Sequence, residues 1–175
     1  MSQSATDTKV GTIATNIKAF VKGKFGANID DVGWMSINGL NGQPGLYINF
    51  ASAKMVVKIF WSGQFSKMNA TMPTVPIVLV DPGAPDKDGT LWMGVLFHEY
   101  GHAAMDKLGK NSEPAAYTVE LLSLWDHVQK NPGDAEIVKT FVKARRAAKQ
   151  YSGFLAGYEV EAKGAYASLA GEAFV

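Results

Sequence analysis

The feature that most constrains this chain is the segment HEYGH, which places His98 and His102 four residues apart in the run LWMGVLFHEYGHAAMDKL. That run contains no proline and is followed by Gly109, a residue type that often ends helices, so it predicts a helix. Residues four apart on a helix lie on the same face, one turn from each other. Both imidazoles therefore project to one side, as a metal ion bound to one helix requires. Glu99 lies beside that face, where it can act on a metal-bound water.

Length and composition indicate one ordinary globular domain. The chain has 175 residues, of which 47% are hydrophobic and 19% charged, which is normal for a packed core. We therefore expect a single domain over residues 1–175. The net charge of +1 disfavours a dedicated nucleic-acid-binding protein, because such proteins usually carry a basic excess. The chain has no cysteine, which excludes disulfide scaffolds, Cys-ligated metal sites and thiol nucleophiles.

The sequence predicts no targeting or membrane-spanning segment. The polar start MSQSATDTKV lacks the basic and apolar regions of a signal peptide, and residues 1–8 are expected to form a flexible tail. The longest apolar stretches, MVVKIFW and PIVLV, are far too short to cross a bilayer. We therefore expect a soluble protein without a membrane partner, either cytoplasmic or associated with a phage or toxin system.

The chain before HEYGH is predicted to form a helix and a few short strands. Apolar residues recur at helical spacing from Val10 to Val21, which predicts a helix there. The runs VGWMSI, LYINF and PIVLV are rich in β-branched and aromatic residues and are typical of strands. The run SAKMVVKIF fits either a strand or a helix. PGAPDKDG is typical of a loop, and Thr90 after it is a suitable helix N-cap.

The chain after HEYGH is predicted to be helical. Gly109 is expected to end the first helix, and Ser112 is expected to cap a second helix that runs through AAYTVELLSLWDHV. From Ala135 onward the sequence is rich in Ala, Lys and Glu, which predicts further helices. Together the segments predict an α+β fold, in which a small mixed β-sheet packs on the HEYGH helix and a helical C-terminal part follows.

The run LFHEYGHAA resembles the active-site helix of the zincin metallopeptidases, whose signature is HExxH. The resemblance extends from Thr90 to about Leu122 and does not include the first eighty residues. It implies a zincin-like fold and a zinc ion bound by His98 and His102. It also implies that Glu99 is the general base in the hydrolysis of a peptide or protein substrate.

The third zinc ligand is expected to be a carboxylate, because a catalytic zinc usually takes three protein ligands and the chain has no cysteine. If Gly109 to Ser112 joins two antiparallel helices, reflection through that turn places Glu120 almost opposite His102. Glu113 then lies about 9 Å too far along the axis. Glu120 also shares a helical face with apolar residues, where a carboxylate is costly unless something pairs with it. Glu120 is therefore the predicted third ligand, in a site that resembles the gluzincins.

Other residues stay open as candidates for two roles. Glu113 is the alternative third ligand, because ExxAYxxE resembles the helix of other HExxH proteins in which the first Glu binds the metal. The remaining carboxylates considered for that role are Asp106, Glu159, Glu161 and Glu172. The residues considered for stabilising an oxyanion are His127, Tyr117, Tyr151 and Tyr158.

Two functions of different classes fit these residues. The first is a zinc-dependent metallopeptidase, in which PIVLV or LYINF forms an edge strand that holds an extended substrate. The second is a catalytically inactive binding or structural protein with a zincin-like fold, such as a component of a phage or toxin system. The intact HEYGH favours the enzyme.

Overall fold

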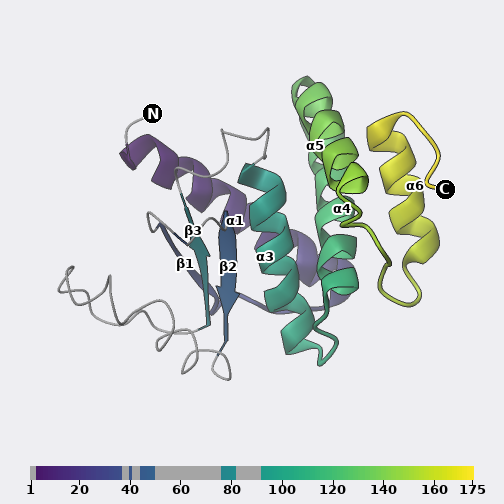
Figure 1. Cartoon of the computed structure of the whole chain (residues 1–175). Helices are drawn as coiled ribbons and strands as arrows, with labels where there is room; N and C mark the ends of the chain where they lie inside the picture. Colours follow the sequence, from purple (N-terminus) through teal and green to yellow (C-terminus); the bar gives the residue numbers. More distant parts are fainter. Residues whose placement is uncertain (1–2, 37–39, 41–43, 50–75, 82–91) are drawn as a thin grey trace.

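Residues 3–36, 40, 44–49, 76–81 and 92–175 are described by the computed structural model of the chain (Figure 1). They include most of the three predicted strand runs, the HEYGH segment and everything after it. The loop PGAPDKDG, the N-cap Thr90 and the ambiguous run SAKMVVKIF lie outside the described residues.

Three short strands form a mixed sheet: β1 (Gly33–Ser36), β2 (Gly45–Ile48) and β3 (Ile77–Val80). The order is β1-β3-β2, with β1 parallel and β2 antiparallel to β3. All four residues of β3 are buried because this strand is central, which accounts for the uninterrupted apolar run PIVLV. Within the described part of the sheet β2 is an edge strand. These three strand predictions and the small mixed sheet are confirmed.

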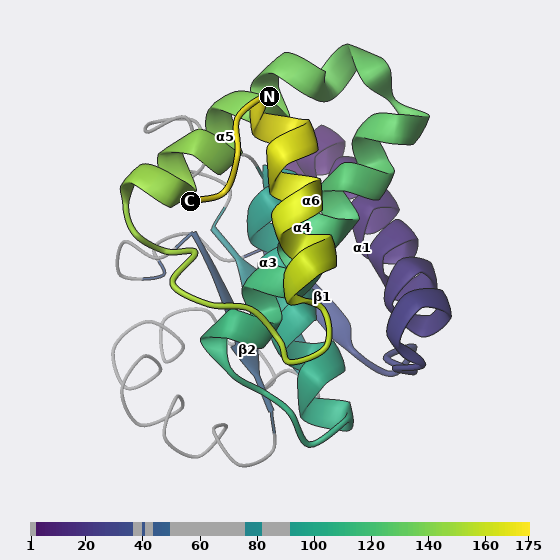
Figure 2. The ribbon, with the colours of Figure 1, turned by 90° about the vertical axis from the view of Figure 1, so that its right-hand side faces the viewer.

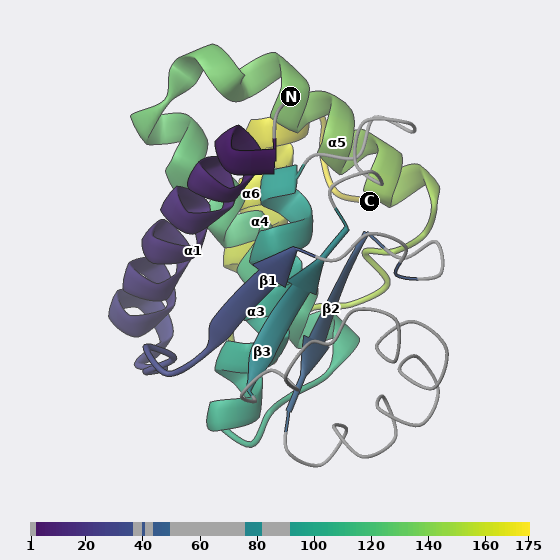
Figure 3. The ribbon, with the colours of Figure 1, turned by 90° about the vertical axis from the view of Figure 1, so that its left-hand side faces the viewer.

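Five α-helices accompany the sheet in the described part of the chain: α1 (Gln3–Phe25), α3 (Trp92–Lys107), α4 (Glu113–Lys130), α5 (Ala135–Ala147) and α6 (Glu159–Ala170). In Figure 1, α3 lies between the sheet and α4, and α6 packs on the far side of α4. Figure 3 shows α1 beside β1, where it also contacts α3. The predicted α+β class is therefore confirmed, with the helical part at the C-terminal end.

The first helix begins earlier than the sequence analysis predicted. A flexible tail was expected for residues 1–8, but α1 starts at Gln3. No glycine or proline interrupts the segment before Gly11, so helical hydrogen bonds extend upstream from the part that packs on the core. That part is where the apolar spacing placed it, since Val10, Ile17 and Val21 are buried.

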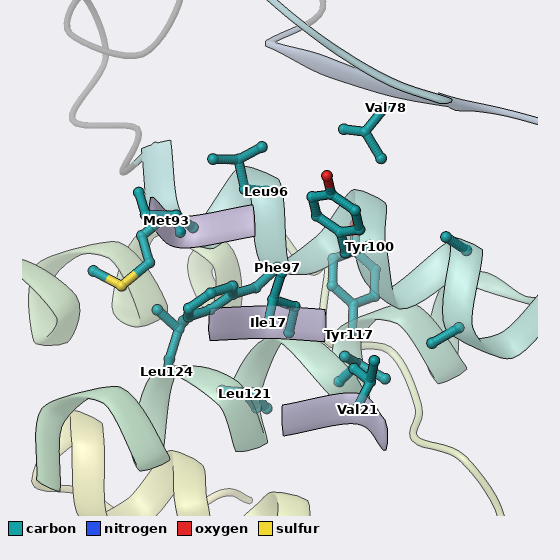
Figure 4. Close-up of a cluster of buried hydrophobic side chains, with 14 of the residues drawn as sticks. Ile17, Val21, Val78, Met93, Leu96, Phe97, Tyr100, Tyr117, Leu121 and Leu124 are labelled. Carbon is teal, nitrogen blue, oxygen red and sulfur yellow. The ribbon is translucent and has the colours of Figure 1, made fainter. Parts of the chain in front are cut away.

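The hydrophobic core lies where α1, α3, α4 and the sheet meet. Figure 4 shows side chains from all of these elements in one cluster: Ile17, Val21, Val78, Leu96, Phe97, Tyr100, Leu121 and Leu124. Three of them, at positions 96, 97 and 100, belong to α3 and are at most 4% exposed. Because this face of α3 is fixed in the core, the helix cannot rotate, and the direction of its histidines is fixed with it.

A tight connection joins α3 to α4. Gly109 has φ of 66°, a left-handed conformation that glycine adopts without strain, and Lys110 N donates to Met105 O at 2.8 Å. Ser112 caps α4 by accepting a hydrogen bond from Ala115 N through its side chain. The predicted helix end and the predicted helix start are both confirmed.

The two helices also approach each other closely. A Cβ atom on Gly101 would lie 3.0 Å from Ala116 O and 3.1 Å from Val119 Cβ. A side chain here would press on the backbone of α4, so glycine permits the helices to pack this closely. The close approach places the start of α4 against the HEYGH face of α3.

Candidate metal centre

His98 and His102 point their Nε2 atoms at each other from successive turns of α3. The two Nε2 atoms are 3.2 Å apart, and the rings are nearly perpendicular, with centroids 4.8 Å apart. His98 is 7% exposed, because the ring of Tyr117 covers it at a centroid distance of 4.5 Å. The predicted placement of both imidazoles on one face of one helix is what the structure has.

Glu113, the first residue of α4, completes a three-residue cluster. Its Oε2 lies 3.3 Å from His98 Nε2, and its Oε1 lies 3.4 Å from His102 Nε2. These three side chains form a group that could hold a metal ion. Two atoms bound to one zinc ion at about 2.0–2.1 Å and at the tetrahedral angle are roughly 3.3–3.4 Å apart. The spacing of the nitrogen and oxygen atoms therefore fits a zinc ion.

The other nitrogen of each imidazole faces an oxygen atom. His102 Nδ1 lies 2.8 Å from Asn111 Oδ1, and His98 Nδ1 lies 3.4 Å from Glu120 Oε2. At His102 the Asn111 oxygen favours a proton on Nδ1, which leaves Nε2 as the nitrogen that can bind a metal. At His98 the Glu120 carboxylate lies beside Nδ1 as an ion-pair contact without hydrogen-bond geometry. Nε2 of both rings faces the cluster.

The structure favours Glu113 over Glu120, the residue predicted as third ligand. Glu120 lies on the opposite side of the His98 ring, beside Nδ1, and does not reach His102. Reflection through the turn from Gly109 to Ser112 placed Glu120 almost opposite His102 and Glu113 too far along the axis. In the structure Tyr117 packs on His98 and Gly101 lies against Ala116, so the first turns of α4 pack on the HEYGH face and bring Glu113 to both Nε2 atoms.

Glu120 is buried, with a hydrogen bond at Oε1 and ion-pair contacts at Oε2. Its side chain has no exposed surface. Arg145 Nη2 lies 2.9 Å from Oε2, and the Tyr151 hydroxyl donates to Oε1 at 2.7 Å. A buried carboxylate at this position needs a partner, as the sequence predicted. The partners are an arginine, a tyrosine and His98 instead of a metal ion. Sequence analysis missed Arg145, whose only signal was a cation in the amphipathic α5.

Glu99 lies at the rim of the same cluster. Its Oε2 accepts a hydrogen bond from Tyr47 N of β2 at 2.8 Å, which fixes one carboxylate oxygen. Gly45 lets β2 come this close, since a Cβ there would lie 2.7 Å from Val95 Cγ1 and 3.0 Å from Glu99 Cγ. Burial raises the pKa of Glu99, against the opposing effect of His98 and His102. A carboxylate held in this way is suited to accept a proton.

The electrostatics of the cluster favour a bound cation. Burial lowers the pKa of His98, but hydrogen bonds to Glu113 and Glu120 outweigh it and raise the pKa to about 9. The pKa of Glu113 is held below its usual value, chiefly by its hydrogen bond to His98. The surrounding carboxylates therefore stabilise positive charge between them, and a divalent metal ion supplies such charge.

The cluster opens into a cleft of about 420 Å³. One wall is the β2 segment from Pro44 to Tyr47, and the opposite side carries His98, His102, Glu113 and Arg145. Of the two strands considered for substrate binding, LYINF forms β2 and lines the cleft, whereas PIVLV forms the central strand β3. The Tyr47 hydroxyl donates to Asp106 Oδ2 at 3.0 Å and ties this wall to α3.

The structure places the other sequence candidates in different roles. Asp106 accepts hydrogen bonds from Tyr47 and Asn49, and His127 lies 2.7 Å from Asp134 Oδ2. Tyr117 covers His98, Tyr151 binds Glu120, and Tyr158 stacks on Phe25. The three C-terminal carboxylates pair elsewhere: Glu159 with Gly157 N, Glu161 with Lys24, and Glu172 with Tyr166 and Lys143.

Comparisons with family models, curated proteins and solved structures each found no match. Among the described helices, none is both long and apolar enough to span a bilayer.

Proposed function

We propose that this protein is a zinc-dependent metallopeptidase that hydrolyses peptide bonds with water. The observation that carries the proposal is the convergence of His98 Nε2, His102 Nε2 and the Glu113 carboxylate at one mouth of a cleft that Glu99 also lines. Two imidazoles and one carboxylate form a ligand set typical of catalytic zinc, which keeps a fourth position open for water or substrate. The side chain of Glu113 is 63% exposed, so solvent reaches the cluster on the side of Glu113.

The proposed mechanism gives the metal and the residues of the cleft different roles in hydrolysis. Zinc, when bound, supplies a Lewis acid that polarises a carbonyl and makes water acidic near neutral pH. Glu99 accepts the proton of the attacking water and delivers it to the leaving amine. The Tyr47 N–H holds Oε2 of Glu99, which leaves Oε1 as the carboxylate oxygen not bound by this main-chain donor.

The strand β2 is suited to hold the substrate. Within the described part of the sheet it is an edge strand, and it forms one wall of the cleft beside Glu99. An extended peptide that lies along such a strand exposes its carbonyl groups at regular intervals to one line of side chains. The proposed substrate is therefore an unfolded or extended segment of a peptide or protein.

The proposal is tested by metal content and cleavage together. The purified protein should contain about one equivalent of zinc by elemental analysis, and it should cleave members of a mixed peptide library. Glu99→Gln should keep the zinc, because Glu99 is outside the ligand cluster, and should lose cleavage by about 10²–10⁴-fold.

Two outcomes would contradict the proposal. Zinc loss in Glu99→Gln would show that Glu99 is a ligand and would overturn its role as a base. Zinc without cleavage in the wild type would favour the inactive binding protein of zincin-like fold.

A further inference from the structure

Glu120 occupies a buried position, where the lost hydration of a carboxylate costs much free energy. Its side chain has no exposed surface, and it lies in the part of α4 whose residues from Ala115 to Leu124 are all buried. A buried charge persists only when opposite charge and hydrogen bonds compensate for its lost hydration. The structure shows which groups compensate, and they come from three separate parts of the chain.

Each partner of Glu120 belongs to a different segment. His98 is on α3, Arg145 is on α5, and Tyr151 follows α5 in the connection to α6. Arg145 is held by further contacts, since Nη1 donates to Gln150 Oε1 at 2.9 Å and the guanidinium lies 4.9 Å from the Phe141 ring centroid. Figure 2 shows α5 at the upper left of the view and the connection after it running down before the chain enters α6.

Glu120 and Glu113 contact opposite nitrogen atoms of the His98 ring. Oε2 of Glu120 lies beside Nδ1 of His98, while Nε2 of the same ring faces Glu113. The 3.4 Å contact is an ion pair without hydrogen-bond geometry. A negative charge beside Nδ1 favours a proton there and Nε2 as the metal ligand. Glu120 therefore acts on the metal position through His98 without touching the cluster atoms.

We propose that Glu120, held by Arg145 and Tyr151, is a positioning residue that orients His98 and couples metal binding to the packing of α5 and the segment after it. This inference rests on the zinc centre of the proposed function. It extends that function by making the C-terminal helical part a component of the site. The one-helix signature HEYGH is then insufficient for tight binding unless this part of the fold is in place.

The first test measures zinc affinity by competition with a chromophoric chelator. Glu120→Gln keeps the side-chain volume but removes the charge, and it should weaken zinc binding by about 10–100-fold. Tyr151→Phe removes one hydrogen bond to Glu120 and should weaken binding less, by up to about tenfold. The control Glu136→Gln changes an exposed glutamate on α5 and should leave affinity unchanged.

Two further readouts separate positioning from simple stabilisation. The visible spectrum of the cobalt-substituted protein should change in Glu120→Gln, because the orientation of one ligand changes, and stay unchanged in Glu136→Gln. Zinc should also slow hydrogen exchange in residues 145–155 of the wild type, and it should do so much less in Glu120→Gln. A purely structural role would lower the melting temperature with and without zinc equally and leave the cobalt spectrum as it is.

The zinc affinities of the wild type and of Glu120→Gln distinguish a failure of the zinc centre from a failure of the role proposed for Glu120. If the wild type binds no zinc, the zinc centre and this inference are both overturned. If the wild type binds zinc and Glu120→Gln binds it equally tightly, only this inference is overturned. If Glu120→Gln does not fold, Tyr151→Phe decides, and unchanged zinc affinity in that variant overturns the inference.

Discussion

At the scale of single residues, two glutamates seven positions apart on α4 have different environments and therefore different chemistry. The side chain of Glu113 is 63% exposed and meets both Nε2 atoms, whereas that of Glu120 is fully buried and meets Nδ1 of His98. The burial of the side chain distinguishes the two glutamates, because a metal ligand that is open to solvent leaves room at the metal for water and substrate. Sequence spacing alone does not show depth at the first turn of a helix.

Replacement of Glu113 tests this assignment directly. Glu113→Ala removes a ligand and not merely its support, so zinc affinity should fall by at least about 100-fold. The fold should tolerate the change, since an exposed side chain at a helix start contributes about 0.3–1 kcal/mol. The measurement is a zinc competition titration together with a melting curve in chelator. The matched control is Glu136→Ala, another exposed glutamate in a first helical turn. Full zinc retention in Glu113→Ala would return the search to Glu120.

At the scale of elements, the sequence predicted the helices and strands well and their register poorly. HEYGH, the glycine at 109 and the cap at Ser112 defined α3 and the start of α4 from local chemistry alone. The pairing of α4 with α3 depends on Gly101, whose missing side chain determines how closely and at which turn the helices meet. That information is distributed over both helices, and no local pattern contains it.

Gly101→Ala should therefore affect both stability and the metal. The new Cβ would lie 3.0–3.1 Å from backbone atoms of Ala116, so α4 must move, at a cost of about 1–3 kcal/mol in the free energy of unfolding. The movement also separates Glu113 from the histidines and should weaken zinc binding. Urea unfolding and zinc titration measure the two effects. Gly164→Ala on α6, where the new Cβ has no neighbour within 4 Å, should instead stabilise by about 0.5–1 kcal/mol.

The contact between β2 and α3 gives a second element-level prediction. Tyr47→Phe removes the hydroxyl that binds Asp106 and should cost about 0.5–1.5 kcal/mol of stability. The main-chain bond from residue 47 to Glu99 stays possible but is less well held, so kcat should fall while zinc affinity stays the same. Peptide cleavage and zinc titration distinguish these effects. A parallel loss of zinc would show that β2 supports the ligands as well as the base.

At the scale of the whole molecule, the site joins parts of the chain that are far apart in sequence. β2 supplies the cleft wall, α3 the histidines and Glu99, α4 the carboxylate of Glu113, and α5 the arginine behind Glu120. The sequence predicted the positions of His98, Glu99 and His102, because their spacing is periodic within one helix. It missed Tyr47, Asn111 and Arg145, whose roles depend on tertiary contacts with no periodic signal.

Because the ligands come from two helices that pack around one core, zinc should stabilise the entire fold. A metal that binds the native state and not the unfolded chain adds RT ln(1 + [L]/Kd), about 2.7 kcal/mol at a free concentration of 100 Kd. The melting temperature should rise with zinc and fall when a chelator is added, with one transition throughout. The unfolding of Glu113→Ala should respond to neither, which controls for zinc bound elsewhere on the surface. A zinc-dependent shift of equal size in that variant would place the stabilising ion outside the cluster of His98, His102 and Glu113.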